Sequence, residues 1–331
     1  MLQIKSKLIK SNSYNPYENL ALEEYLLHHV QEEEVILYLW QNQNTIVIGK
    51  NQNPWKECRV SQVERDGVSL ARRLSGGGAV YHDLGNLNFT FIMRDKLYNL
   101  EKQLQVIIDA VQNLGIEATF TGKNDITVEG RKFSGNAFYF SNQGSYHHGT
   151  ILVNTDMNPL TKYLQVSREK LESKGIDSVR SRVINLVELN PELTIENVNQ
   201  ALEKSFETIY GGPIEKMKLP QKENLEDYIQ KYTSWEWRFG ETPKFNIEFE
   251  KRFDFGTITF LFLLKDSKIQ DVTIYSDAIF TDILENIKKI LVGVPFSTIK
   301  IIEALSSLST KNNEEEKIIQ DIQQWLLEKE I

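Results

Sequence analysis

The pattern of apolar and polar positions predicts both helices and strands in the first part of the chain. Asn15 and Pro16 suit the cap and the first position of a helix, and apolar residues then recur at helical spacing. Helices are expected from residue 15, over 103–114 and from Thr194, and strands over 35–40, 45–50, 86–93, 120–140 and 146–153. Alternation predicts that the strand at 86–93 is buried on one face only. Strands and helices do not alternate regularly, which favours an α+β fold over a doubly wound sheet.

The pattern changes after Val153. Residues 156–182 are polar and rich in Lys and Arg, which predicts a loop with a short helix, and residues 218–224 are typical of a linker. A second unit is expected from about Phe245, with strands near 245–253, 257–264 and 269–275 and helices near 280–291, 297–305 and 314–327. A chain of 331 residues exceeds the usual size of one domain. The sequence therefore predicts two domains, residues 1–244 and 245–331.

Composition excludes several classes of function. A net charge of −8 argues against a general nucleic-acid binder or a protein that binds membrane surfaces. The single cysteine, Cys58, excludes an internal disulfide framework and a zinc site built from several thiolates. The apolar runs are too short to cross a bilayer, and residues 1–13 lack the apolar region of a signal peptide. We expect a cytoplasmic protein with no nucleic-acid or membrane partner.

Three consecutive glycines, Gly76 to Gly78, follow the pair Arg72 and Arg73. Glycines leave the backbone N–H groups open to a ligand, and such groups can together hold an anion. Arginines supply forked donors for phosphate or carboxylate. The block is neither a Walker A loop nor a dinucleotide fingerprint. It predicts an anion site, with a solvated surface loop as the alternative.

Lys132 follows a turn expected at Glu129 and Gly130, and Asp125 lies just before that turn. A lysine held on a rigid hairpin suits a reaction in which negative charge develops on a phosphate. Asp125 suits Mg²⁺ or an amine partner. Taken alone, Lys132 is more typical of a solvated surface residue.

The adjacent histidines His147 and His148 suggest a metal site. Neighbouring strand residues point to opposite faces, however, so the two rings cannot easily share an ion. His148 or Gly149 is expected to line a pocket instead. Cys58 is either an acyl-accepting nucleophile or an inert, half-buried thiol, and the second interpretation is favoured.

Six blocks, in order, resemble bacterial lipoate–protein ligase A. The resemblance runs from about Asn15 to the C-terminus and is specific because order and spacing are kept. The blocks are Gln52–Cys58, Arg72–Asn86, Arg131–Gly135, Tyr146–Thr150, Lys174–Val183 and Ser234–Gly240.

The resemblance implies a large N-terminal α+β domain like the catalytic core of biotin and lipoate ligases, with mixed sheets and packed helices, and a small α+β accessory domain. It implies an ATP-dependent ligase with two steps. Lipoate and MgATP give lipoyl-AMP and pyrophosphate, and a carrier lysine then takes the lipoyl group and releases AMP. ATP is a substrate in this scheme, and no tightly bound organic cofactor is expected.

The resemblance also implies roles for single residues. Lys132 is the catalytic residue, in contact with nucleotide and lipoate, where it stabilises negative charge. The other ATP contacts are Arg73, Gly78, Ala79, Val80 and Tyr81. Lipoate contacts are expected at Ser75, Gly76, Gly77, His148 and Gly149. A loop that covers the adenylate contains Lys174, Ser178, Arg180 and Arg182. Mg²⁺ is expected to arrive with ATP, with Asp125 as its protein ligand.

Two alternatives remain. An ATP-independent octanoyl or lipoyl transferase would use Cys58, but the second domain and the arginine pair favour the ligase. A non-catalytic protein that binds lipoyl domains would not need Lys132. The sequence leaves open lipoate or octanoate as the acid. It also leaves open a dehydrogenase E2 lipoyl domain or the glycine-cleavage H protein as acceptor. A monomer is expected.

Overall fold

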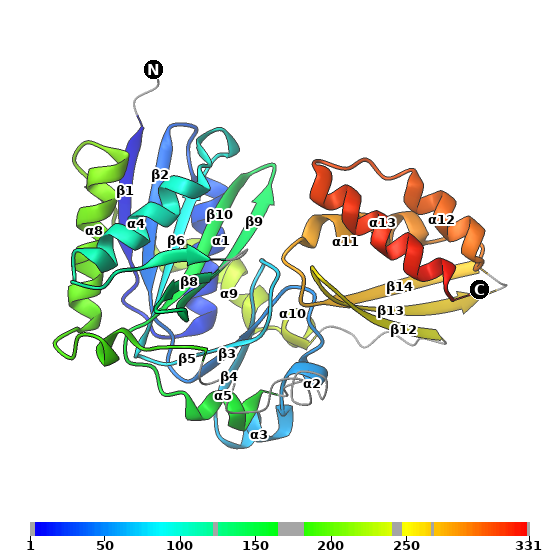
Figure 1. The fold of residues 1–331 in the computed structure, drawn as a ribbon, viewed down its shortest axis with the longest axis horizontal. Helices are drawn as coiled ribbons and strands as arrows, with labels where there is room; N and C mark the ends of the chain where they lie inside the picture. The colour runs from blue at the N-terminus through cyan, green and yellow to red at the C-terminus, as the bar shows by residue number, and fades with distance from the viewer. Residues whose placement is uncertain (1–3, 122–124, 165–181, 240–246, 266–267, 330–331) are drawn as a thin grey trace. The chain divides into compact units, whose positions relative to one another are not determined.

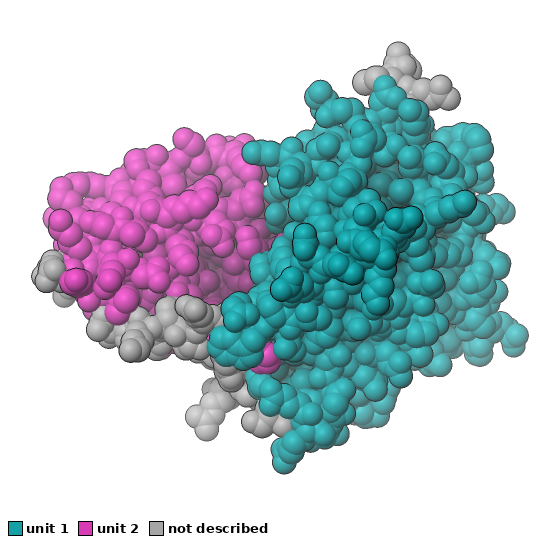
Figure 2. Space-filling model, turned by 180° about the vertical axis from the view of Figure 1, so that it is seen from behind, with its two compact units in different colours: residues 1–48, 54–73, 79–238 teal, residues 49–53, 74–78, 239–331 magenta. Residues whose placement is uncertain are grey.

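The computed structural model describes residues 4–121, 125–164, 182–239, 247–265 and 268–329 (Figure 1). The chain divides into two compact units, coloured separately in Figure 2. The first unit comprises residues 1–48, 54–73 and 79–238, and the second comprises 49–53, 74–78 and 239–331. Mixed sheets and packed helices confirm the predicted α+β class. The predicted domain boundary, between residues 244 and 245, lies outside the described residues.

A mixed eight-stranded sheet forms the centre of the first unit. Its order is β11-β1-β2-β6-β10-β9-β8-β7. β1 pairs in parallel with β2 and β11, and β6, β10, β9 and β8 continue the sheet in antiparallel pairs. The strands are β1 (Lys5–Lys10), β2 (Glu34–Trp40), β6 (Asn86–Met93), β7 (Thr119–Thr121), β8 (Asp125–Val128), β9 (Arg131–Ser141), β10 (Gly144–Leu152) and β11 (Glu215–Lys216).

Helices cover both faces of this sheet. α4 (Leu100–Gln112) and α8 (Ile195–Tyr210) pack on one face, against a core that includes Leu87, Phe89 and Phe91 of β6. α1 (Pro16–His29) contacts β6 and β10 through the other face, and the Asn15 side chain caps it as predicted, accepting from the Tyr17 N–H at 2.9 Å. The prediction that β6 is buried on one face is wrong. All eight of its residues are buried because helices cover the sheet on both sides.

A second, three-stranded sheet in the first unit has the order β4-β3-β5. Its strands are β3 (Thr45–Ile48), β4 (Ser69–Arg72) and β5 (Val80–His82), and β3 and β4 are parallel. The parallel strands end side by side, with the Arg73 N–H donating to the Ile48 carbonyl at 3.0 Å. Segments 49–53 and 74–78 therefore leave the same edge of this sheet. Short helices α2 (Pro54–Glu57) and α3 (Val60–Arg65) lie between β3 and β4 in the chain, and α5 (Asn158–Tyr163) contacts α3 and β5.

The predicted linker at residues 218–224 ends in a short 3-10 helix, and two helices that the sequence did not predict follow it. A 3-10 helix at Lys222–Leu225 is followed by α9 (Glu226–Thr233) and α10 (Trp235–Phe239). α9 contacts α1 and β4. The segment is thus part of the packed first unit.

The second unit consists of an antiparallel sheet and three helices. The strands β12 (Ile247–Phe253), β13 (Gly256–Lys265) and β14 (Lys268–Ser276) are followed by α11 (Thr281–Leu291), α12 (Thr298–Ser306) and α13 (Asn313–Leu327). Phe260, Phe262 and Trp325 are at the centre of its core. All six predicted elements are present.

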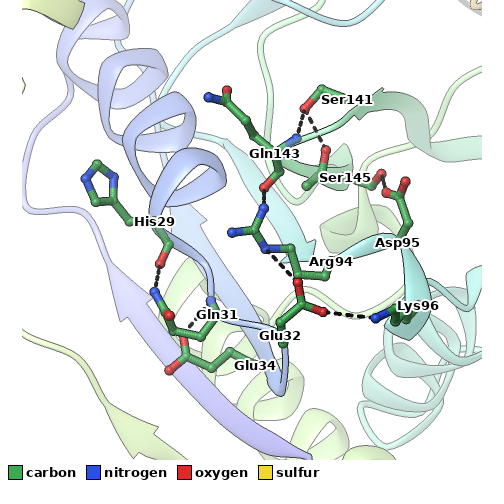
Figure 3. A network of polar contacts seen from close by, with 11 residues as sticks. His29, Gln31, Glu32, Glu34, Arg94, Asp95, Lys96, Ser141, Gln143 and Ser145 are labelled. Carbon is green, nitrogen blue, oxygen red and sulfur yellow. Dashed lines mark hydrogen bonds and ion pairs between the residues drawn. The ribbon is translucent and has the colours of Figure 1, made fainter.

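Polar residues connect three turns at one end of the eight-stranded sheet (Figure 3). Arg94, after β6, donates to the Gln143 carbonyl in the β9–β10 turn and lies 4.0 Å from Glu32. Lys96 lies 3.6 Å from the same carboxylate. The network lies at the C-terminal end of β6, where Met93 pairs with Ser145. Asn88, which pairs with Thr150, lies towards the other end of the strand. Exposed pairs of this kind contribute little to stability.

Within the described residues, every helix is too short or too polar to cross a membrane.

Candidate active site

A register shift in the β8–β9 hairpin determines where Lys132 points. Thr127 pairs with Lys132, but Ile126 pairs with Ser134 and Asp125 with Gly135, so β9 contains one extra residue. In a regular strand, residues three positions apart point to opposite faces, and a bulge changes this. The Lys132 side chain consequently crosses Gly135. A Cβ added to Gly135 would lie 2.8 Å from both Lys132 Cε and Nζ.

The Lys132 ammonium ends beside Asp125. Nζ lies 2.6 Å from Asp125 Oδ1, and about a third of each side chain is exposed, at 34% and 38%. The Lys132 main chain is held from the other side, because its N–H donates to the Arg182 carbonyl at 2.7 Å and its carbonyl accepts from the Ile184 N–H at 3.0 Å. The sequence placed Lys132 and Asp125 in one site, and the structure brings them together on one face of the hairpin.

The two adjacent histidines point to opposite faces, as predicted. His148 lies on the face covered by α1, where Nδ1 is 2.9 Å from Glu23 Oε1. The same oxygen accepts from the Thr90 hydroxyl at 2.6 Å, and the Thr90 oxygen accepts from Trp40 Nε1 at 3.0 Å. All four side chains are buried. The four side chains form one connected, buried polar cluster.

His147 lies on the face of α4. Its ring nitrogens are 3.0 Å from Gln103 Oε1 and 2.8 Å from Asn136 Oδ1. Burial, with a smaller contribution from His148, lowers the pKa of His147 to about 3. Burial, with contributions from Arg73 and His148, likewise lowers the pKa of His82 to about 3. Both imidazoles are neutral in the folded protein at neutral pH.

These depressed pKa values predict a loss of stability in weak acid. Below pH 6.5 the unfolded chain binds protons on these histidines while the folded chain does not, so the free energy of unfolding falls as pH falls. Each histidine contributes a slope of up to about 1.4 kcal/mol per pH unit. Denaturant titrations between pH 6.5 and 5 should show a shallower pH slope for His147→Gln than for wild type. Equal slopes would contradict a neutral His147.

The two arginines before the glycines have different surroundings. Arg72 donates through Nε and Nη2 to the carbonyls of Trp237 and Arg238, both at 2.9 Å. Arg73 is buried and donates through Nη1 to the Val47 carbonyl at 3.2 Å. Burial lowers the pKa of Arg73 to about 10, while Tyr146 and Glu23 raise it. Arg73 is therefore a buried cation near the cluster of His148, and Arg72 is held by main-chain carbonyls.

β5 carries Val80 and Tyr81 along the edge of the small sheet. Val80 is half-buried, as is Ala79 just before it, whereas Tyr81 is buried and its hydroxyl donates to Asn44 Oδ1 at 3.2 Å. Burial raises the pKa of Tyr81 to about 12. The Tyr81 hydroxyl is thus protonated at neutral pH. The roles predicted for these residues in binding ATP remain predictions.

The glycine loop belongs to the second unit, and its three glycines differ. A Cβ on Gly76 would lie 2.3 Å from the Ala278 carbonyl oxygen, so packing requires glycine there. Gly77 adopts φ +92, which disfavours other residues. A Cβ on Gly78 would meet nothing within 4 Å. The predicted anion site therefore has its most open backbone at Gly78. The Ser75 side chain is buried, and its carbonyl accepts from the Lys50 N–H at 2.9 Å.

Close packing also requires a glycine at position 149. A Cβ there would lie 2.6 Å from Phe89 Cζ and 2.7 Å from the Gly135 carbonyl oxygen. Its predicted contact with lipoate remains a prediction. Lys174, Ser178 and Arg180 of the predicted adenylate loop lie outside the described residues. Arg182 is described, is exposed, and pairs through its carbonyl with Lys132.

Cys58 has the properties of an inert thiol. It is 1% exposed, and burial raises its pKa to about 12, with Glu57 adding to the effect. A thiolate is the nucleophilic form, so this environment disfavours nucleophilic chemistry at neutral pH. The sequence predicted a half-buried thiol, and the structure buries it fully.

The described residues contain no group of three or more His, Cys, Asp or Glu side chains arranged to hold a metal ion. Asp125 already has the Lys132 ammonium as its counter-ion. The residues around Asp125 therefore fit a metal that arrives on phosphate groups better than a protein-built cage. Its role as a Mg²⁺ ligand remains a prediction.

Two residues of the site were missed by the sequence interpretation. Glu23 lies within a helix that is buried over most of its surface, so its burial gave no periodic signal. Gly135 was noted only as a small residue after Lys132, because the bulge that brings the two together depends on pairing with β8. The only sign of Glu23 in the sequence was an acidic residue within an apolar stretch of the predicted helix.

Comparisons with known proteins give a consistent result. Residues 15–207 match the family model for the lipoyl protein ligase A/B catalytic domain, and residues 242–326 match that for the bacterial lipoate protein ligase C-terminus. The chain is 40% identical to the lipoate-protein ligase A of Psychrobacter cryohalolentis, over 98% of each chain.

Solved structures agree. The lipoate complex of P. falciparum LipL1 superposes with a TM-score of 0.85 at 34% identity, over 97% of this chain and 99% of that one. A bipartite lipoate protein ligase from Thermoplasma acidophilum, determined in a study of that ligase and its E2 lipoyl domain, superposes with a TM-score of 0.65 at 25% identity. It covers 74% of this chain and 100% of its own.

Proposed function

The chain belongs to the lipoate–protein ligase A family and is a ligase, and from this premise we propose that it adenylates lipoate with ATP and transfers the lipoyl group to a lysine of a carrier protein. The observation that carries the proposal is the placement of Lys132. A bulged hairpin holds the Lys132 ammonium beside Asp125. Hydrogen bonds to Arg182 and Ile184 fix the Lys132 main chain. Such a preorganised cation suits charge that develops on phosphate and acyl oxygens.

In the first step a lipoate carboxylate oxygen attacks the α-phosphorus of ATP, forming the mixed anhydride lipoyl-AMP as the bond to pyrophosphate breaks. In the second step the neutral carrier amine attacks the acyl carbon and its nitrogen loses a proton to solvent. An amide forms as the bond between the acyl carbon and the phosphate oxygen breaks and AMP leaves with the electron pair. Lys132 stabilises the added charge in both steps and is not a nucleophile. Asp125 would contact a Mg²⁺ ion carried by ATP, and that ion would neutralise phosphate charge.

The proposed binding residues divide between the two substrates. Arg73, Gly78, Ala79, Val80, Tyr81 and Lys132 bind ATP. Ser75, Gly76, Gly77, Lys132, His148 and Gly149 bind lipoate. The buried His148–Glu23 pair supports a lipoate pocket on the α1 face, because buried polar groups with fixed partners orient a mainly apolar ligand. Octanoate fits the same chemistry, since small changes in an apolar chain alter binding by only about 1–3 kcal/mol.

The acceptor proposed is a dehydrogenase E2 lipoyl domain or the glycine-cleavage H protein. The Thermoplasma acidophilum ligase was studied with an E2 lipoyl domain, which supports the first. A monomer in the cytoplasm is part of the same proposal.

Lipoate-dependent exchange of pyrophosphate into MgATP tests the first step, and the mass of an apo lipoyl domain tests the second. We expect exchange that requires lipoate, and a gain of one lipoyl group on the domain only when MgATP is present. Acyl transfer from a pre-loaded carrier without ATP would replace the proposal with the transferase alternative. Binding to the domain without either reaction would replace it with the non-catalytic one.

The transferase alternative also predicts a different result for Cys58→Ser. Because the thiol is buried and protonated, this substitution should leave lipoate-dependent exchange within about twofold of wild type. Circular dichroism should confirm that the variant is folded. A folded Cys58→Ser protein without activity would contradict an inert thiol.

A further inference from the structure

Two pairs of adjacent charged residues in the first unit send their side chains to different places. Glu23 and Glu24 follow one another on α1, and Arg72 and Arg73 follow one another at the end of β4. Glu23 and Arg73 belong to the buried surroundings of His148. Glu24 and Arg72 instead contact residues of the α9–α10 segment, residues 226–239. The α9–α10 segment therefore contacts Glu24, the neighbour of Glu23, and Arg72, the neighbour of Arg73.

The first connection is reciprocal. Arg72 donates to the Trp237 and Arg238 carbonyls, both at 2.9 Å, and Trp237 Nε1 donates back to the Arg72 carbonyl at 2.9 Å. Both the side chain and the main chain of Arg72 are thus held by α10. Arg72 is only 6% exposed, so these charge-assisted bonds form away from water, where they are strongest. The position of the next residue, Arg73, follows from that of Arg72.

The second connection is an ion pair. Lys231 of α9 lies 2.7 Å and 2.9 Å from the two carboxylate oxygens of Glu24, which is 7% exposed. The Lys231 ammonium also lies 4.3 Å above the Trp237 ring, within the range of a cation–π interaction. The Trp237 side chain therefore contacts both Arg72 and Lys231. Figure 1 shows α9 and α10 in yellow-green.

We propose that the α9–α10 segment is a clasp that positions Arg73 for ATP and Glu23 for lipoate, with Trp237 and Lys231 as its positioning residues. The proposal rests on the proposed function. The segment lies between the two regions that match family models, residues 15–207 and 242–326, where a connecting linker is the default interpretation. A linker has no need of buried, reciprocal bonds to two site-bearing elements.

The two connections predict separate kinetic effects. Trp237→Phe keeps an aromatic ring for Lys231 but removes the donor to Arg72, so the KM for ATP should rise about two- to tenfold with little change for lipoate. Lys231→Met removes the ion pair with Glu24, so the KM for lipoate should rise by a similar factor with little change for ATP. Lys231→Arg keeps the charge and should restore most of the affinity. A purely structural role would reduce the folded fraction and leave both KM values unchanged.

Pyrophosphate exchange measured over ranges of ATP and lipoate tests the clasp. Trp235→Phe is the control, because Trp235 lies on the same helix and is 48% exposed. Glu24→Gln provides a second variant of the Lys231 connection with the shape of the side chain retained. Separate KM shifts, absent in the control, support the clasp. Unchanged KM values, or equal shifts for both substrates, overturn it while the wild type remains active. A wild type without lipoate-dependent exchange would remove the proposed function itself.

Discussion

Lys132→Met should strongly slow adenylate formation while leaving the protein folded. The ammonium is the cation that the bulged hairpin presents, so its removal should lower lipoate-dependent pyrophosphate exchange by about 10²- to 10³-fold. The side chains of Lys132 and its partner Asp125 are each about one-third exposed, so stability should change by no more than about 1 kcal/mol. Exchange assays and denaturant titrations measure the two effects.

Lys7→Met is a matched control. Lys7 belongs to the same unit and lies 2.6 Å from Glu34, the same distance as in the Lys132–Asp125 pair, but its side chain is only 16% exposed and lies on β1. Its loss should cost stability and leave exchange intact. Activity near that of wild type in Lys132→Met, or equal activity losses in both variants, would show that Lys132 has no electrostatic role in the reaction.

Periodicity predicted the second unit well because its elements are strongly patterned. β12 alternates between half-buried and exposed positions along its whole length, and α11 and α13 each bury one face. The short strands β4 and β5 have four and three residues, which is too few to show a period, and they were missed. α9 and α10 were missed for a related reason. They are short, and their contacts with α1 and β4 include polar side chains such as Lys231 and Arg238, which give no apolar period.

The candidate site was only partly predictable, because its geometry depends on contacts distant in sequence. Lys132 and Asp125 were predicted to lie in one site because they are on consecutive strands joined by a short turn. The partner of His148 is Glu23, 125 residues away, and no local pattern connects the two. The opposite orientation of His147 and His148 follows from strand geometry alone and was predicted correctly. The glycines were assigned to anion binding, yet Gly76 is also required by packing against Ala278, in a part of the chain far from the motif.

Gly135→Ala should impair catalysis without unfolding the protein, which would separate the position of Lys132 from its presence. The added methyl group would lie 2.8 Å from Lys132 Cε and Nζ, and the next neighbour, Thr150 Oγ1, would be at 3.8 Å. Lys132 is flexible, so it can move aside at little cost to the fold. The displaced ammonium should lower pyrophosphate exchange by about tenfold to a hundredfold, since misplacement by about 1 Å has effects of that size.

Gly149→Ala provides the contrast on the neighbouring strand. Its methyl group would meet Phe89, the Gly135 carbonyl and Asn136 at 2.6 to 2.8 Å, and these buried groups cannot move freely, so the free energy of unfolding should fall by about 1–3 kcal/mol. Thermal denaturation and exchange rates should therefore separate the two variants, with Gly135→Ala stable and slow and Gly149→Ala destabilised. A Gly135→Ala protein with wild-type exchange would mean that the path of Lys132 across β9 is not the one used in the reaction, because the ammonium would then reach its substrate from another rotamer.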